Sequence, residues 1–124
     1  MGQVLSFPQG LIGFRDARRF VLLESGRSAS PFRRLVALDV PDLSFIVCDP
    51  RRFWPGYETG LPPDDGDHEV LVIVTAPGAA RDLTANLMAP LVLDVRSGVG
   101  RQLVLDTGRY STRHPLPAAL AATG

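Results

Sequence analysis

Residues that could support catalysis or bind a metal are few and lie far apart in this sequence. The two histidines, His68 and His114, have no cysteine or second histidine nearby, whereas zinc sites usually bring their ligands as close pairs. The acidic stretch 64–67 has part of the pattern of a calcium loop, but the glutamate that would supply the bidentate ligand is missing at the required offset. The spacing therefore predicts no metal site and favours a solvated loop.

Nucleophiles and phosphate-binding motifs are also missing. Cys48 is the single cysteine, so it cannot form an internal disulfide, and no basic residue stands beside it to lower its pKa. The chain has no G-x-S-x-G motif, and all 13 of its basic residues are arginine, so a P-loop lysine is absent. We therefore expect no catalytic residues and no cofactor, and predict that the protein is not an enzyme.

Composition sets further limits on function. The chain has 124 residues, enough for one domain with a core, and its 13 basic and 13 acidic residues give a net charge of zero. Nucleic-acid binders usually carry a basic excess, so direct nucleic-acid binding is disfavoured. The N-terminus does not look like a signal peptide, and the apolar runs are too short to span a bilayer. These features predict a cytoplasmic protein that does not interact with membranes.

Short runs of strand-forming residues recur along the chain, separated by glycine and proline. The alternation in 69–76 is apolar on both faces, with Val70, Val72 and Val74 on one side and Leu71 and Ile73 on the other, which predicts a central strand covered on both sides. Helical spacing is limited to one turn within 79–88 and a short helix or frayed tail at 115–122. The pattern predicts an all-β fold, a compact antiparallel β-barrel-like single domain with little helix. The expected strands are 3–7, 19–24, 32–39, 43–48, 69–76, 91–96, 101–106 and an extended piece at 110–114.

The connection 83–90 differs from an ordinary turn. It lies between two predicted strands, and a simple reversal there would need only glycine, asparagine or aspartate. Instead it combines the turn and cap residues Thr84, Asn86 and Pro90 with apolar residues such as Leu87. This composition indicates a structured loop with a specific role.

Several motifs, taken in order, resemble the flagellar assembly factor FliW family. An F-x-x-G-[LI]-x-G-F turn matches 7–14, and T-x-N-L-x-A-P matches 84–90. Between them stand a P-F pair at 31–32, a strand ending before Pro50, and Tyr57; G-x-Q-x-x-L and Y-x-x-R follow at 100–105 and 110–113. The resemblance spans about residues 3–116. The chain departs from the family pattern at Arg15, at 35–37 and at Asp94.

The resemblance implies a FliW-like β domain over 1–116, followed by a short C-terminal tail over 117–124. It also implies a cytoplasmic, non-enzymatic regulator with two protein partners. One is the RNA-binding translational repressor CsrA, whose repression of flagellin mRNA would be relieved. The other is flagellin itself, which would compete for the factor in a partner switch.

Candidate partner-binding residues come from the motifs, each with a structural alternative. Phe14 could be core, Asn86 could tie down backbone groups, and the tyrosines could pack at the rim of a barrel. Gln102 alternates with leucines and is expected on an exposed sheet face, while one or both of Gly10 and Gly13 are expected to need a positive φ. The acidic cluster in 64–69 is a candidate patch for CsrA, with a solvated loop as the alternative. The full set of candidates is Phe14, Tyr57, Thr84, Asn86, Leu87, Pro90, Gln102 and Tyr110.

Two other functions remain open from the sequence alone. A small-molecule-binding β-barrel would need a sizeable pocket with convergent polar groups. A structural homo-oligomer would form by pairing of exposed strand edges.

Overall fold

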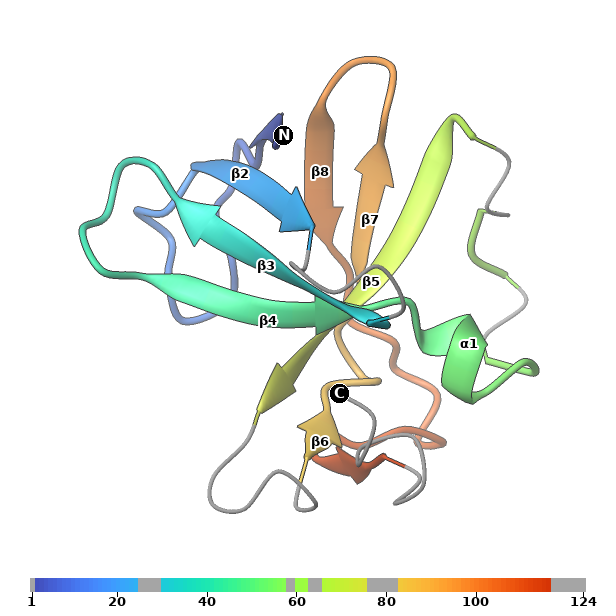
Figure 1. Cartoon of the computed structure of the whole chain (residues 1–124). Coiled ribbons are helices and arrows are strands. Elements are labelled where there is room, and N and C mark those ends of the chain that lie inside the picture. The colour runs from blue at the N-terminus through green and yellow to red at the C-terminus, as the bar shows by residue number, and fades with distance from the viewer. Residues whose placement is uncertain (1, 25–29, 58–59, 63–65, 76–82, 117–124) are drawn as a thin grey trace.

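The computed structural model describes residues 2–24, 30–57, 60–62, 66–75 and 83–116. Seven strands form a closed barrel in the order β4-β3-β2-β1-β8-β7-β5, and pairing of β4 with β5 closes it (Figure 1). Two short strands, β6 (Thr84–Ala85) and β9 (His114–Pro115), extend the sheet beyond β5. This confirms the predicted β-barrel-like fold. The barrel strands are β1 Gln3–Ser6, β2 Arg19–Glu24, β3 Phe32–Ala37, β4 Ser44–Cys48, β5 His68–Thr75, β7 Leu91–Asp94 and β8 Val99–Gln102.

All strand pairs are antiparallel except β1 with β8. That parallel contact has a single register pair, Ser6 with Val99, and is supported by a hydrogen bond from the Ser6 amide to the Gly98 carbonyl at 2.7 Å. A side-chain bond from Gln3 Nε2 to the Val95 carbonyl at 3.1 Å adds to it. The first four strands therefore form a meander, and this short seam joins the meander to β8.

The central strand β5 divides the apolar interior into two clusters, as its sequence pattern predicts. Val70, Val72 and Val74 belong to one cluster, which also holds Tyr57 and Leu87. Leu71 lies in the other, with Ile73 packed against it. The second cluster fills the barrel with large side chains of which many are fully buried: Leu5, Phe7, Leu11, Phe20, Leu35, Val47, Leu91 and Leu93.

A single turn of helix follows β4, which the sequence analysis did not predict. Helix α1 spans Pro50–Phe53. Asp49 is its N-cap, where the side chain accepts a hydrogen bond from the Arg51 amide at 2.9 Å, and Pro50 occupies the first turn. Both are ordinary helix-start residues. The helix buries Phe53 and directs the chain toward Tyr57.

Three expected elements differ from the structure. The strand expected at 101–106 ends at Gln102, and the piece expected at 110–114 contains a turn before β9 (His114–Pro115). The helical turn expected within 79–88 is wrong for the described part, because Thr84–Ala85 forms β6 against the end of β5. Residues 76–82 and 117–124 lie outside the described residues, and so does most of the expected C-terminal helix or tail.

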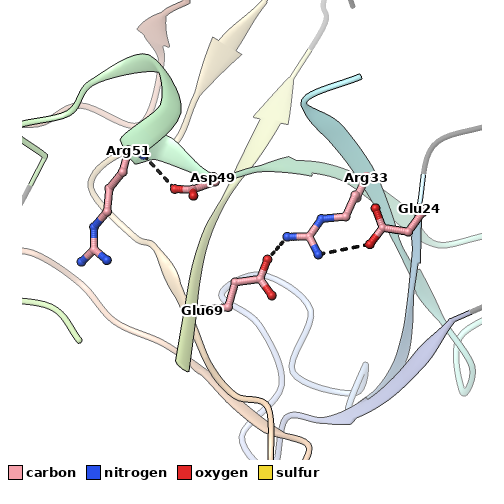
Figure 2. A network of polar contacts seen from close by, with 5 residues as sticks. All are labelled: Glu24, Arg33, Asp49, Arg51 and Glu69. Carbon is pink, nitrogen blue, oxygen red and sulfur yellow. Dashed lines mark hydrogen bonds and ion pairs between the residues drawn. The ribbon is translucent and has the colours of Figure 1, made fainter. Parts of the chain in front are cut away.

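An ionic cluster links three strands near one end of the barrel. Arg33 on β3 pairs with both Glu24 on β2 and Glu69 on β5, and its guanidinium lies between the two carboxylates in Figure 2. The side chains of Arg33 and Glu69 are mostly buried, whereas that of Glu24 is exposed. The negative charge of Glu69, a residue of the expected acidic patch, is therefore neutralised by Arg33 of the same chain. Asp64 and Asp65 of that patch lie outside the described residues.

Candidate functional site

The loop between β6 and β7 is an insertion along one edge of β5. Thr84 pairs with Thr75 and Leu91 pairs with Leu71. Between these pairs β5 advances four residues, from 71 to 75, while the facing chain advances seven, from 84 to 91. Three extra residues must therefore be accommodated, and the chain bulges away from the sheet edge over 86–90. Such bulges redirect side chains and interrupt pairing.

Asn86 fixes the start of this bulge. Its amide donates a hydrogen bond to the Ile73 carbonyl at 2.9 Å, and its side-chain Oδ1 accepts one from the Ala89 amide at 3.1 Å. The side chain thus acts as an acceptor for a backbone group of its own turn, as asparagine often does in loops. This confirms the structural role that the sequence suggested for Asn86.

Two tyrosines support the bulge from inside the protein. The Tyr57 hydroxyl donates to the Leu87 carbonyl at 2.6 Å, and both residues are buried. The Tyr57 ring meets the Tyr110 ring edge-on with 4.9 Å between centroids. These residues therefore hold the loop in place, and Tyr57 and Leu87 offer almost no surface to a partner in this conformation.

Gln102 joins the bulge to the N-terminal turn. Its Nε2 donates to the Ala89 carbonyl at 3.1 Å, and its Oε1 accepts from the Ile12 amide at 2.8 Å. The residue is half-buried, so both ends of its amide serve internal contacts and it does not project from an open sheet face. Pro90, also buried, accepts a bond from the Leu103 amide at 2.9 Å.

The N-terminal turn exposes two apolar side chains, those of Ile12 and Phe14. Gly10 and Gly13 have φ of 69° and 84°, as expected from the sequence. The turn closes with an isolated bridge between Leu11 and Phe14. Phe14 is 43% exposed and meets Phe45 edge-on at 5.3 Å. The alternative that Phe14 is a core residue is therefore wrong.

These elements enclose an open apolar groove of about 470 Å³, which we call the Phe14 groove. Its walls come from the N-terminal turn, the start of β4, the end of β5, and the side chains of Asn86 and Gln102. Ile12 and Ile46, which line it, are 48% and 39% exposed, a large exposure for isoleucine. The lining residues are Leu11, Ile12, Phe14, Ser44, Phe45, Ile46, Ile73, Val74, Thr75, Asn86 and Gln102.

The sequence candidates thus divide into two groups. Phe14, Asn86 and Gln102 line the groove, and half-buried Thr84 pairs with the lining residue Thr75. Tyr57, Leu87, Pro90 and Tyr110 are not among the lining residues; Leu87 and Pro90 belong to the bulge, and the two tyrosines support it. Sequence reasoning missed Ile12 and Ile46. An isoleucine between the two glycines of a turn was the available signal for Ile12, and Ile46 carried none.

The described residues contain no group of three or more histidine, cysteine or acidic side chains placed to hold a metal ion.

Burial, reinforced by the nearby Asp49, raises the pKa of the Cys48 thiol to about 12. A thiol with such a pKa stays protonated and is a poor nucleophile near neutral pH. The described lining of the Phe14 groove includes no histidine, cysteine, aspartate or glutamate, and its apolar side chains can bind apolar groups.

The family model described as "FliW protein" matches residues 1–116. The chain belongs to the FliW family. Curated relatives named "Flagellar assembly factor FliW" include one from Thermoanaerobacter pseudethanolicus, 34% identical over 122 residues and covering 91% of this chain and 81% of the relative. Another, from Heliobacterium modesticaldum, is 36% identical over 129 residues, covering 97% and 84%.

A solved structure described as "Crystal structure of the flagellar assembly factor FliW" superposes with a TM-score of 0.79. It is 32% identical and covers 93% of this chain and 86% of that one. The protein is thus a member of a family of non-enzymatic flagellar assembly factors. No helix among the described residues is long and apolar enough to cross a membrane.

Proposed function

We propose that this FliW family member acts in the cytoplasm by binding two proteins in turn. It binds the translational repressor CsrA, relieving repression of flagellin mRNA, and it binds flagellin, which competes for the factor. Family membership over residues 1–116 carries the proposal, because the matched relatives are flagellar assembly factors. The Phe14 groove supports it, since exposed apolar surface of this kind is typical of protein-binding sites.

A purely small-molecule role has less support. Apolar side chains fill the barrel, where a ligand-binding β-barrel would place its cavity. The Phe14 groove is open and has only a few polar groups, and the amide of Gln102 is already used at both ends. A binding protein for other proteins is therefore the function that this surface fits best.

Titration calorimetry of the purified protein against CsrA and flagellin from the same organism tests the proposal. We expect sub-micromolar binding to each and a loss of CsrA binding when flagellin is present in excess. Binding to flagellin alone would remove the translational role, and binding to neither would overturn the proposed function. A monomeric mass independent of concentration would separately exclude a structural homo-oligomer.

A further inference from the structure

The Phe14 groove has cationic neighbours on two sides. A smaller hollow of about 210 Å³ adjoins it and shares Ile12 and Gln102 with it. Arg15 and Arg101 line this hollow, and both are exposed. At the β4 wall of the groove, Arg34 Nη2 donates to Ser44 Oγ at 2.9 Å. We call Arg15, Arg34 and Arg101 the arginine rim.

No carboxylate balances this rim within the described lining. The residues that line the groove and the adjoining hollow include neither aspartate nor glutamate. The ion pairs that Arg33 forms with Glu24 and Glu69 involve no arginine of the rim. Arginine keeps its charge at every physiological pH and has five donors. Arg15 uses one of them in a long bond of 3.4 Å to the Gln9 carbonyl. The rim therefore retains positive charge and free donors beside an apolar surface, although the chain as a whole is neutral.

We propose that the Phe14 groove and its arginine rim bind an acidic amphipathic segment of a partner protein. Apolar side chains of that segment would replace water over Ile12, Phe14 and Ile46. Carboxylates flanking them would meet the guanidinium groups, which form paired hydrogen bonds with carboxylates. The inference rests on the proposed function, because it assigns a chemistry to the partner contact. Charge complementarity selects an acidic segment over a basic one.

The apolar half of the proposal is tested with Ile12→Asp. The Ile12 contact with Gln102 uses the backbone amide, so the substitution leaves that bond available while it places a charge in the groove. The matched control is Leu38→Asp, because Leu38 is 54% exposed and lies outside the groove lining. We expect Ile12→Asp to weaken binding of CsrA, flagellin or both by about tenfold or more, the size typical of an interface anchor. The control should bind as the wild type does.

The charged half is tested with the double variant Arg15→Glu, Arg101→Glu. Its control is Arg96→Glu, at an exposed position in the turn between β7 and β8 and outside both linings. Wild-type binding should weaken as salt rises, because salt screens exposed charges. The double variant should bind at least about tenfold more weakly at low salt and lose most of that salt dependence. Thermal melts of every variant verify that each is folded.

The outcomes separate the two claims. If the wild type binds neither protein, the proposed function fails and this inference fails with it. If the wild type binds, but folded Ile12→Asp and the double variant bind equally well, the proposed function stands and the groove is not the docking surface. If only the double variant keeps full affinity, an acidic segment is excluded.

Discussion

At the scale of single residues, the site depends on side chains whose roles are mostly internal. Asn86, Gln102 and Tyr57 each bind backbone groups of the bulge or the N-terminal turn. Motif residues such as these therefore shape a surface that other side chains present. The large apolar side chains that line the groove and are exposed are those of Ile12, Phe14 and Ile46.

Gly10 shows how tightly the N-terminal turn is determined. Its φ is 69°, and a Cβ there would lie 2.5 Å from the Arg15 carbonyl oxygen. Gly10→Ala should lower the free energy of unfolding by about 2–4 kcal/mol, because backbone strain and a steric clash act together. Gly13→Ala is the control, since Gly13 also has a positive φ but a Cβ would meet nothing within 4 Å. It should cost only about 1–2 kcal/mol, and equal losses in urea denaturation would contradict this account.

Cys48 gives a prediction about pH. Burial raises the pKa of its thiol from 9.0 to about 12, so the folded protein keeps the proton while the unfolded chain loses it. Stability from this group is complete below the unfolded pKa and is lost as pH rises from about 9 toward 12. Ellman's reagent should therefore label the thiol only after unfolding. In Cys48→Ala the alkaline fall in melting temperature should be shallower, and rapid labelling of the native protein would refute the assignment.

At the scale of elements, the longer strands were more predictable than the short strands and the single-turn helix. Strand β2 begins and ends where its sequence indicates, and the two-faced pattern of β5 correctly placed it between two clusters. Strands β6 and β9 were missed because two residues are too few for alternation to be visible. Helix α1 was missed although Asp49 and Pro50 are standard start residues, since a single turn has no apolar period. The groove was only partly predictable because its walls meet through tertiary contacts.

The bulge between β6 and β7 should depend on the Asn86 side chain. Asn86→Ala removes the acceptor for the Ala89 amide and should lower the unfolding free energy by about 1 kcal/mol. It should also weaken partner binding, because Asn86 lines the Phe14 groove. Asn86→Asp keeps an acceptor at the same place and should be less destabilising. Equal stability of wild type and Asn86→Ala would show that the bulge does not need this bond.

The turn between β7 and β8 should respond to acid through Asp94. The amides of Arg96 and Ser97 both donate to Asp94 Oδ1 at 3.1 Å, and the Ser97 bond foremost holds the pKa of this carboxyl below its ordinary value. A lowered folded pKa means that the stabilisation is complete above the ordinary pKa of about 3.9 and disappears as pH falls through the folded pKa. Asp94→Ala should melt earlier than wild type at neutral pH, and the difference should shrink on acidification. A constant difference down to strongly acidic pH would contradict this.

At the scale of the whole molecule, the ladders that join neighbouring strands of the barrel differ in length. The β2–β3 and β3–β4 ladders each have five register pairs, whereas β1 and β8 share one. The weak parallel contact was not predictable, because nothing in the sequences of β1 and β8 encodes which distant strand each would meet. Local alternation predicts strands, but closure depends on the whole arrangement.

This difference in ladder length should be visible in the hydrogen-exchange rates of backbone amides. The Ser6 amide, which donates to Gly98 across the seam, should exchange with solvent faster than the Val21 and Val36 amides of the β2–β3 ladder. Local openings with few bonds to break need less free energy than openings within long ladders. Exchange measured by NMR under native conditions gives the rates. Equal protection at all three amides would mean that the barrel opens only as a unit.

The positions that the barrel joins are far apart along the chain, and this affects the protein while it is being made. Ser6 cannot pair with Val99 until residue 99 has been synthesised. Likewise β4 cannot pair with β5, whose first residue is His68, until β5 has been synthesised. A ribosome that has released only the first four strands therefore presents a sheet with both edges unpaired, and such edges attract other chains. Truncated or stalled products ending before β5 should accumulate as aggregates, and efficient folding in the cell should require that synthesis proceed without long pauses through residue 102.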